Sequence, residues 1–384
     1  MNYPLPLASL SSAPIEPDAM QRLGEIISTH IQDKRYPGAQ IALAHKGSLV
    51  WEQSFGQARV GHGHEADTKA MAADKASLWL LYSNTKIIMA TLLWRLHEQG
   101  KLRFTDRVTQ YLPEFGKNGK DAITLFQLIT HQGGFPDGDV PSATWNDHAK
   151  VREAVCNFHV QWEPGSRISY HGLSAHWVLA MVIEAVTGQD FRNVIRSEVL
   201  EPLGLAKDLF VGLPQSETPR MAFLYEPDDK ASNGLRLRDE STSRVWQEAG
   251  VPGGGAYGTA RGMVALYQMM LQGGMLNGVR LVSPRTLAYA IQNYTGDRVD
   301  AFMGIPMHRG LGPHLRGTTI GMRGLGSLAK PDTFGHGGVG TSYCWADPQS
   351  GLSFAYITNA RVPDPWHSIR LDQVSNLIHA SIKQ

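Results

Sequence analysis

Residues 83–86 read Ser83-Asn84-Thr85-Lys86, and a mostly apolar stretch follows them as far as Gly100. The apolar residues recur at roughly helical spacing and the glycine suits a helix C-terminus, so this stretch predicts a helix that begins near Ser83. Side chains three residues apart share one face of a helix. The Lys86 amine is therefore expected beside the Ser83 hydroxyl, where it favours the alkoxide by its charge or, if neutral, accepts the proton.

A serine at the start of a helix has an ordinary alternative role, which is to cap the first turn. The chain also holds a second Ser-x-x-Lys, at Ser327-Leu328-Ala329-Lys330. Pro331 follows that lysine directly and disfavours helical geometry there. The second copy is predicted to be a loop, and only Ser83 is a candidate nucleophile.

The composition is that of a globular protein with two domains or one large one. The 384 residues carry 36 basic and 35 acidic side chains, which argues against a nucleic-acid partner. The first ten residues lack a basic segment and no stretch is apolar enough to span a bilayer, so we expect a cytoplasmic location and no membrane partner. Cys156 and Cys344 are expected to be free, buried thiols.

Strands are predicted near both ends of the chain. Alternating apolar residues with turn signals between them predict one hairpin within residues 38–56 and another within 341–359. Helices are predicted over residues 17–36, 177–186 and 369–383. One mixed sheet built from both ends, with a helical region inserted, makes this an α+β chain.

The predicted domain boundaries follow from that pattern. Residues 1–83 and 251–384 are expected to form a discontinuous α/β domain, and residues 84–250 a mainly helical inserted domain. Ser83 falls at the boundary, and clefts between domains are where small-molecule sites tend to lie.

A serine nucleophile also needs a residue that carries protons. Tyr170 is the best candidate, because it lies just before the helix expected to start near Leu173. A tyrosine near an ammonium has its phenolate favoured, so we expect a lowered pKa for Tyr170 and general base work. Most tyrosines, however, only pack and form hydrogen bonds.

The third element is His336-Gly337-Gly338-Val339. Adjacent glycines let a strand approach a ligand closely, and the Val339 N–H would then face the Ser83 N–H across the reacting carbonyl as an oxyanion hole. The alternative is a strand edge that the glycines merely soften.

The order Ser83-x-x-Lys86, Tyr170, His336-Gly337-Gly338 resembles the class C β-lactamase superfamily. This superfamily includes serine β-lactamases, D-alanyl-D-alanine peptidases and the family VIII carboxylesterases. The resemblance continues in residues 123–135, 253–261 and 334–338, and together these segments span nearly the whole chain.

The resemblance implies a β-lactamase/transpeptidase-like fold, with a mixed antiparallel sheet flanked by helices, and a role for each matching residue. Ser83 would be the nucleophile that forms an acyl-enzyme, and Lys86 and Tyr170 would share the proton work. The amides of Ser83 and Val339 would hold the oxyanion, and His336, Gly337 and Gly338 would bind substrate. No metal or cofactor is implied.

The chain departs from the lactamase pattern at two positions. His336 stands where the lactamases usually have a lysine, which weakens the positive charge near neutral pH. Tyr170-His171-Gly172 replaces Tyr-x-Asn, so the amide that grips an acylamino side chain is missing and the segment is similar to that of many esterases.

These departures favour a carboxylesterase, with a small-molecule ester of short acyl chain as substrate. The alternatives are a β-lactamase, an amide hydrolase similar to D-alanyl-D-alanine peptidases, or an acyltransferase that uses the same acyl-enzyme. The loops 135–146 and 304–326 are expected to shape the acyl and alcohol pockets.

Other motifs are weaker. Residues 62–67 nearly match a zinc pattern, but Ala66 stands where the aspartate should be. Ser174 lacks the second glycine of a nucleophile elbow and is expected to cap a helix. Residues 253–258 fit a dinucleotide motif without a preceding strand and are expected to form a flexible loop before a helix that starts at Thr259. A binding or scaffold protein of the same fold without turnover is the rival outside enzymology.

Overall fold

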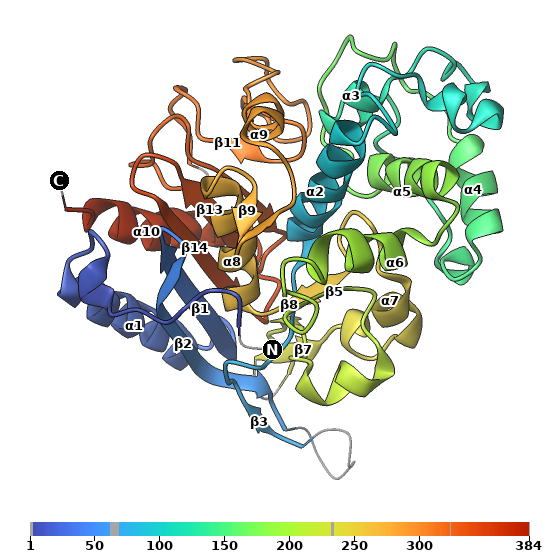
Figure 1. Cartoon of the computed structure of the whole chain (residues 1–384). Coiled ribbons are helices and arrows are strands. Elements are labelled where there is room, and N and C mark those ends of the chain that lie inside the picture. The colour runs from blue at the N-terminus through green and yellow to red at the C-terminus, as the bar shows by residue number, and fades with distance from the viewer. Residues whose placement is uncertain (1–2, 62–68, 232–233, 323, 384) are drawn as a thin grey trace.

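The computed structural model describes residues 3–61, 69–231, 234–322 and 324–383. It has two parts: a sheet covered by helices, built largely from the two ends of the chain, and a group of helices built from its middle (Figure 1). Helix α2 (Thr85–Glu98) lies where the two parts meet (Figure 1). The α+β class is therefore confirmed.

The main sheet has seven strands in the order β11-β12-β13-β14-β1-β2-β3, and every neighbouring pair is antiparallel. Both predicted hairpins, β1–β2 and β13–β14, are confirmed. The strands are β1 (Gly38–His45), β2 (Ser48–Arg59), β3 (Met71–Ala72), β11 (His314–Leu315), β12 (Phe334–Gly338), β13 (Ser342–Asp347) and β14 (Leu352–Thr358). Because β1 pairs with β14, the two ends of the chain are hydrogen-bonded at the centre of the sheet.

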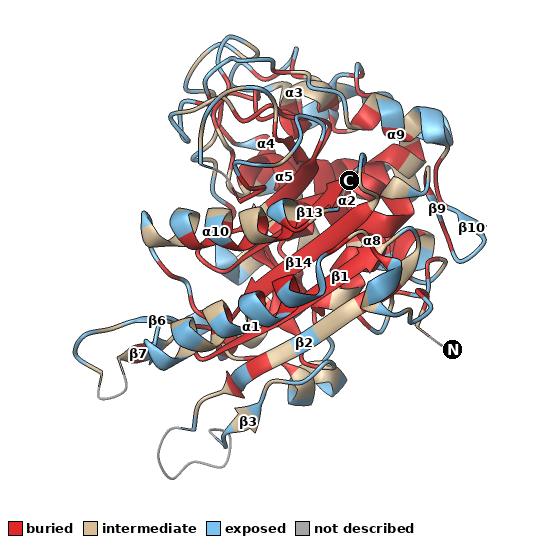
Figure 2. Cartoon of the chain, turned by 90° about the vertical axis from the view of Figure 1, so that its left-hand side faces the viewer, coloured by how far each residue is buried: buried red, intermediate tan, exposed pale blue. Residues whose placement is uncertain are grey.

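Helices cover both faces of this sheet. Side chains alternate between the faces of a strand, so Ile41 and Leu43 of β1 pack with α1 (Pro17–Gln32) and α10 (Trp366–Ala380). Ala42 and Ala44 face the opposite way, toward α8 (Ala260–Leu271). Figure 2 shows α1 and α10 in front of the buried strands β1 and β14. The helices predicted at both ends of the chain are confirmed.

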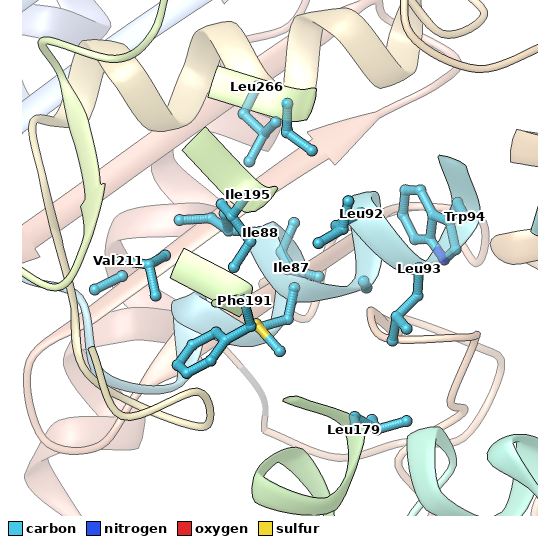
Figure 3. Packing of buried hydrophobic residues seen from close by; sticks show 14 of the residues in the cluster. Ile87, Ile88, Leu92, Leu93, Trp94, Leu179, Phe191, Ile195, Val211 and Leu266 are labelled. Carbon is cyan, nitrogen blue, oxygen red and sulfur yellow. The ribbon is translucent and has the colours of Figure 1, made fainter. Parts of the chain in front are cut away.

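Helix α2 is buried around almost its whole circumference, and only Arg95, His97 and Glu98 reach partial or full exposure. A helix that is apolar on all sides belongs in the centre of a protein. Figure 3 shows Ile87, Ile88, Leu92, Leu93 and Trp94 among side chains of other elements, namely Leu179, Phe191, Ile195, Val211 and Leu266. Since α2 begins beside Ser83, this packing holds the nucleophile candidate rigidly.

The remaining helices are α3 (Leu125–Ile129), α4 (His148–Cys156), α5 (Ser174–Thr187), α6 (Phe191–Ile195), α7 (Arg244–Ala249) and α9 (Pro284–Ala290). Helix α5 contains the predicted helix 177–186 and ends at Gly188, whose φ of 68° is left-handed. Ser174 does not cap α5, contrary to expectation. Its hydroxyl donates to the Phe135 carbonyl at 2.9 Å instead, because loop 135–146 packs on the helix start.

Short strands complete the fold: β4 (Trp79–Leu80), β5 (Leu209–Val211), β6 (Tyr225–Pro227), β7 (Leu235–Leu237), β8 (Ala256–Gly258), β9 (Met275–Leu276) and β10 (Val279–Arg280). Strand β8 pairs with both β4 and β5, and so joins segments from both predicted domains. The domain boundaries themselves stay a prediction. The segment 253–258 is only partly a loop, since β8 occupies its second half, but Thr259 does cap α8 as expected.

Several smaller expectations concern single segments. Residues 327–330 form turns, as predicted, and the Ser327 hydroxyl donates to Asp372 Oδ1 at 2.7 Å. Cys156 and Cys344 are free and buried. None of the helices in the described part of the chain combines the length and the apolar character needed to cross a membrane.

Candidate active site

Ser83 sits in a tight turn that joins the short strand β4 to helix α2. The turn is a 3₁₀ helix over Tyr82–Asn84, and α2 continues from Thr85. Tyr82 has a φ of 44°, in the left-handed region that non-glycine residues avoid at a cost of about 1–3 kcal/mol. Its phenol donates to Glu240 at 2.8 Å and its carbonyl accepts from the Thr85 hydroxyl at 2.6 Å. These bonds hold the turn that presents Ser83.

The structure brings the three predicted side chains together. Lys86 Nζ lies 3.2 Å from Ser83 Oγ, and the Tyr170 hydroxyl donates to Ser83 Oγ at 2.8 Å. Lys86 Nζ also lies 5.0 Å from the centre of the Tyr170 ring. Ser83 and Lys86 come from one helical turn, whereas Tyr170 enters from the loop before α5.

Lys86 is completely buried, with an exposed fraction of 0%. Burial lowers the pKa of Lys86 well below its usual value, and the positive charge of Arg309 lowers the pKa further. Lys86 Nζ donates to the carbonyls of Gly172 at 2.7 Å and Gly253 at 2.6 Å. A neutral amine has two N–H groups and one lone pair. With both N–H groups on carbonyls, a neutral amine has its lone pair left for Ser83, and the lowered pKa favours this neutral form of the two alternatives.

The expected pKa of Tyr170 is wrong in direction. Burial raises the pKa of Tyr170 to about 12, and the hydrogen bond to Ser83 and the charge of Arg309 oppose this only in part. The prediction assumed an ammonium beside the phenol, but the buried Lys86 favours its neutral form. Tyr170 is therefore a neutral phenol at pH 7, suited to donate a proton.

His336 lies on β12 and is almost completely buried. Its Nδ1 lies 2.9 Å from the Gly337 carbonyl, and its ring is 4.1 Å from that of His314. Burial, with a smaller effect from Lys86, lowers the pKa of His336 to about 3. The side chain is neutral at pH 7, in agreement with the weakened charge expected from the sequence.

The glycines after His336 let strand β12 lie against the nucleophile turn. A Cβ atom on Gly338 would lie 2.7 Å from the Leu81 carbonyl, and one on Gly337 would lie 2.6 Å from the Tyr343 ring. Both separations are too short for a side chain. The predicted close approach is thus present, although it is to the backbone just before Ser83.

Val339 follows β12 directly and is 49% exposed. Val339 and Ser83 both line one cavity, which places the two residues of the expected oxyanion hole on the same space. Pairing of their amides on one oxyanion stays a prediction.

The cavity has a volume of about 610 Å³, within the range of small-molecule sites. The described residues that line it are mostly apolar: Ser83, Tyr170, Glu226, Pro227, Phe302, Met303, Ile305, Met307, His314, Met322, Gly324, His336, Gly337, Gly338, Val339, Gly340, Tyr343, Arg361, Val362, Pro363, Asp364, His367, Ser368 and Leu371. Loop 304–326 contributes as expected. Loop 135–146 contributes none of these residues, because it packs instead on the start of α5.

Three buried residues around Tyr170 were not identified from the sequence: His131, Asp300 and Arg309. The His131 ring lies 4.7 Å from the Tyr170 ring, and its Nδ1 accepts from the His171 N–H at 3.0 Å. His131 falls in a segment that resembles the superfamily, which was a usable signal. Asp300 and Arg309 lie in a loop region without a local pattern, and only the tertiary fold reveals their contacts with Tyr170.

One group in the described part of the chain has the residue types of a metal site: His148, Glu184 and Asp190. Glu184 Oε1 already accepts from the Phe191 N–H at 3.1 Å and lies 2.6 Å from His148 Nδ1. Asp190 is paired with Arg192. The two carboxylates therefore have protein partners, His148 Nε2 is buried without one among the described residues, and the cluster lies outside the cavity of Ser83. The zinc-like segment 62–67 lies outside the described residues.

The antiparallel sheet with its helices and the contact of serine, lysine and tyrosine define the class: a serine hydrolase with the β-lactamase fold. The chain belongs to the Beta-lactamase family, whose family model matches residues 23–374. The resemblance inferred from the sequence motifs is thus confirmed.

Individual relatives cover nearly the whole chain. It is similar to the esterase/beta-lactamase LipL of Mycobacterium tuberculosis, with 29% identity over 359 residues that cover 85% of this chain and 78% of that protein. The solved structure of a family VIII carboxylesterase matches with a TM-score of 0.78 and 27% identity over 94% of this chain and 98% of that one. A penicillin-binding protein homolog from Caulobacter crescentus matches with a TM-score of 0.76 and 26% identity, covering 94% and 98% of the two chains.

Proposed function

We propose that the protein hydrolyses carboxylic esters through an acyl-enzyme on Ser83. One observation carries the proposal: Lys86 Nζ lies 3.2 Å from Ser83 Oγ while it donates to the carbonyls of Gly172 and Gly253, so a neutral Lys86 has its lone pair left for the Ser83 proton. A base positioned in this way activates a serine that is otherwise a weak nucleophile.

In acylation, Lys86 accepts the Ser83 proton while Ser83 Oγ attacks the ester carbonyl. The amides of Ser83 and Val339 stabilise the negative oxygen of the tetrahedral intermediate. When the ester C–O bond breaks, Tyr170 donates its proton to the leaving alcohol, and the Lys86 ammonium returns a proton to Tyr170. The acyl group is then bound to Ser83, and Lys86 is neutral again.

In deacylation, water takes the place of the alcohol. The neutral Lys86 accepts a proton from the water as the water oxygen attacks the acyl carbonyl. When the acyl C–O bond breaks, Tyr170 donates its proton to the departing Ser83 Oγ and the Lys86 ammonium returns a proton to Tyr170. The products are a carboxylic acid and the restored serine, so the cycle needs no cofactor.

An ester is preferred to a β-lactam because the groups that recognise lactams in the superfamily are replaced. The neutral His336 supplies no cation for a substrate carboxylate. Gly172 has no side chain, although a Cβ atom there would meet nothing within 4 Å. The apolar wall of the cavity suits the hydrocarbon part of an ester.

Replacing Ser83 with Ala tests the proposal. We expect kcat/KM for p-nitrophenyl acetate to fall by at least about a thousandfold, since the acyl-enzyme cannot form. Ser327→Ala is the matched control, because it changes the serine of the other Ser-x-x-Lys, and it should keep wild-type activity. Retention of most activity by Ser83→Ala would refute the assignment.

The substrate range needs its own measurement. A series of p-nitrophenyl esters of graded acyl length tests the expected short-chain preference in a cavity of about 610 Å³. The name of the LipL relative makes β-lactam hydrolysis the second candidate, and nitrocefin turnover by the pure protein measures it. Acyl transfer would appear as an ester product when a second alcohol is added.

A further inference from the structure

We propose that the buried pair Arg309–Asp300 is a positioning device for the reaction at Ser83. Asp300 holds the backbone of Tyr170, and Arg309 places a fixed positive charge against the Tyr170 ring. This inference rests on the proposed acyl-enzyme function and adds two residues to it, neither of which lines the cavity.

Asp300 is completely buried, and Arg309 is 1% exposed. Arg309 Nη2 donates to Asp300 Oδ2. Asp300 Oδ1 accepts from the N–H groups of Tyr170 at 3.1 Å, Phe302 at 3.0 Å and Met303 at 3.1 Å. A carboxylate with this many donors is firmly held. It ties the backbone of Tyr170 to the segment that forms one wall of the cavity.

The Arg309 guanidinium lies 5.2 Å from the centre of the Tyr170 ring, and Lys86 Nζ lies 5.0 Å from the same ring. An arginine keeps its charge at all relevant pH values. Its charge therefore opposes protonation of Lys86 and favours negative charge on the Tyr170 oxygen, whereas the Asp300 carboxylate acts on the pKa of Tyr170 in the opposite direction. The effect of Arg309 on Lys86 keeps the base neutral, and its effect on Tyr170 helps the phenol to donate its proton.

Four buried histidines also surround Lys86 and Tyr170, and Glu226, Arg361 and Asp364 line the same cavity as Tyr170. Burial lowers the pKa values of His131, His171, His176 and His336. His314 Nε2 lies 2.9 Å from Arg309 Nη1. Because a guanidinium can only donate, His314 Nε2 is the acceptor in this contact. Arg309 and Asp300 are the buried charged pair in contact with Tyr170.

The chain contains a matched pair elsewhere. Arg261 Nε donates to Asp208 Oδ1 at 2.9 Å, and the Arg261 guanidinium lies 5.1 Å from the centre of the Tyr3 ring. The chemistry and the ring distance are nearly those of Arg309, Asp300 and Tyr170. The aromatic partner of this second pair is Tyr3, which does not line the cavity.

The experiment measures two rates against pH for Arg309→Gln, Arg309→Lys and Arg261→Gln. One is kcat/KM for a p-nitrophenyl ester, and the other is labelling of Ser83 by a fluorophosphonate, which needs no ester turnover. In Arg309→Gln the acid limb of both profiles should move to higher pH by about one unit, as expected for the loss of one buried charge nearby. Arg309→Lys keeps the charge and should stay close to wild type, as should Arg261→Gln.

Asp300→Asn is the second variant, and we expect it to shift the acid limb in the opposite direction. Loss of the carboxylate leaves the Arg309 charge less compensated, so the acid limb should move to lower pH. Thermal denaturation of each variant identifies those that are folded. Lower activity with unmoved acid limbs in Arg309→Gln and Asp300→Asn would reduce the pair to a structural element and overturn the proposal. Absence of ester turnover with intact, pH-dependent labelling would instead overturn only the esterase function.

Discussion

Two lysines in the described part of the chain, Lys86 and Lys120, are completely buried, and they have different partners. Lys120, like Lys86, has an exposed fraction of 0%. Lys120 Nζ donates to three backbone carbonyls, those of Lys117 at 2.8 Å, Cys156 at 3.0 Å and Phe158. Three acceptors match the three N–H groups of an ammonium. Lys120 therefore links segments of the chain and has no group left to act on.

Lys86 differs in its third partner. It donates to two carbonyls, and the third contact is the Ser83 hydroxyl, which can itself donate. Burial lowers the pKa of Lys120 to about 8, whereas the pKa of Lys86 is lowered by burial and by Arg309 as well. Burial alone does not make a lysine a base. A base also needs a partner that can give up a proton and a neighbouring charge that keeps the amine neutral.

The strongest test of this comparison is Lys86→Met. The variant removes the base and retains an apolar chain, so we expect kcat/KM for p-nitrophenyl acetate to fall by at least about a hundredfold. Steady-state kinetics measure the change, and added methylamine should restore part of the rate if it enters the space of Nζ. A loss below tenfold would mean that Lys86 is not on the proton path.

Tyr170→Phe is the next test, because it removes a single oxygen. The neutral phenol donates to Ser83 Oγ at 2.8 Å, so its loss should lower kcat by about a hundredfold while the ring packing remains. Tyr3→Phe is a matched control, since Tyr3 lies under Arg261 as Tyr170 lies under Arg309. Equal losses in the two variants would contradict a special role for Tyr170.

Lys120→Met should have the smallest effect on activity. It leaves three buried carbonyls without their donor, and an unsatisfied buried group costs about 1–3 kcal/mol, so the free energy of unfolding should fall by at least this amount. The value of kcat/KM should stay within about twofold of wild type. Urea denaturation and kinetics on Lys86→Met and Lys120→Met together complete the comparison. Loss of activity in a folded Lys120→Met variant would contradict the distinction between Lys86 and Lys120.

Much of the fold could be predicted because its signals are local. The alternating residues of β1 and β2 and the helical spacing in α2 depend on neighbours in the sequence. The pairing of β1 with β14 was expected only in outline, since strands from the two ends of the chain carry no local signal of their register.

The protonation of Tyr170 shows where sequence reasoning failed. The expected low pKa assumed a charged Lys86, and no feature of residues 83–86 reports how deeply that amine is buried. Desolvation is a property of the whole surrounding volume, and here it reverses the sign of the shift. The role of the Arg309–Asp300 pair was also not visible in the sequence, because Tyr170, which both residues contact, comes from a different loop.

The sequence by itself determined the pairing of Ser83 with Lys86, because a helix places residues three apart on one face. It also determined the absence of an amide side chain at Gly172 and of a lysine at His336. Only the tertiary structure decided that Lys86 favours its neutral form, that Tyr170 keeps its proton, and that an apolar cavity opens beside Ser83. These properties depend on how segments distant in the sequence exclude water from one place.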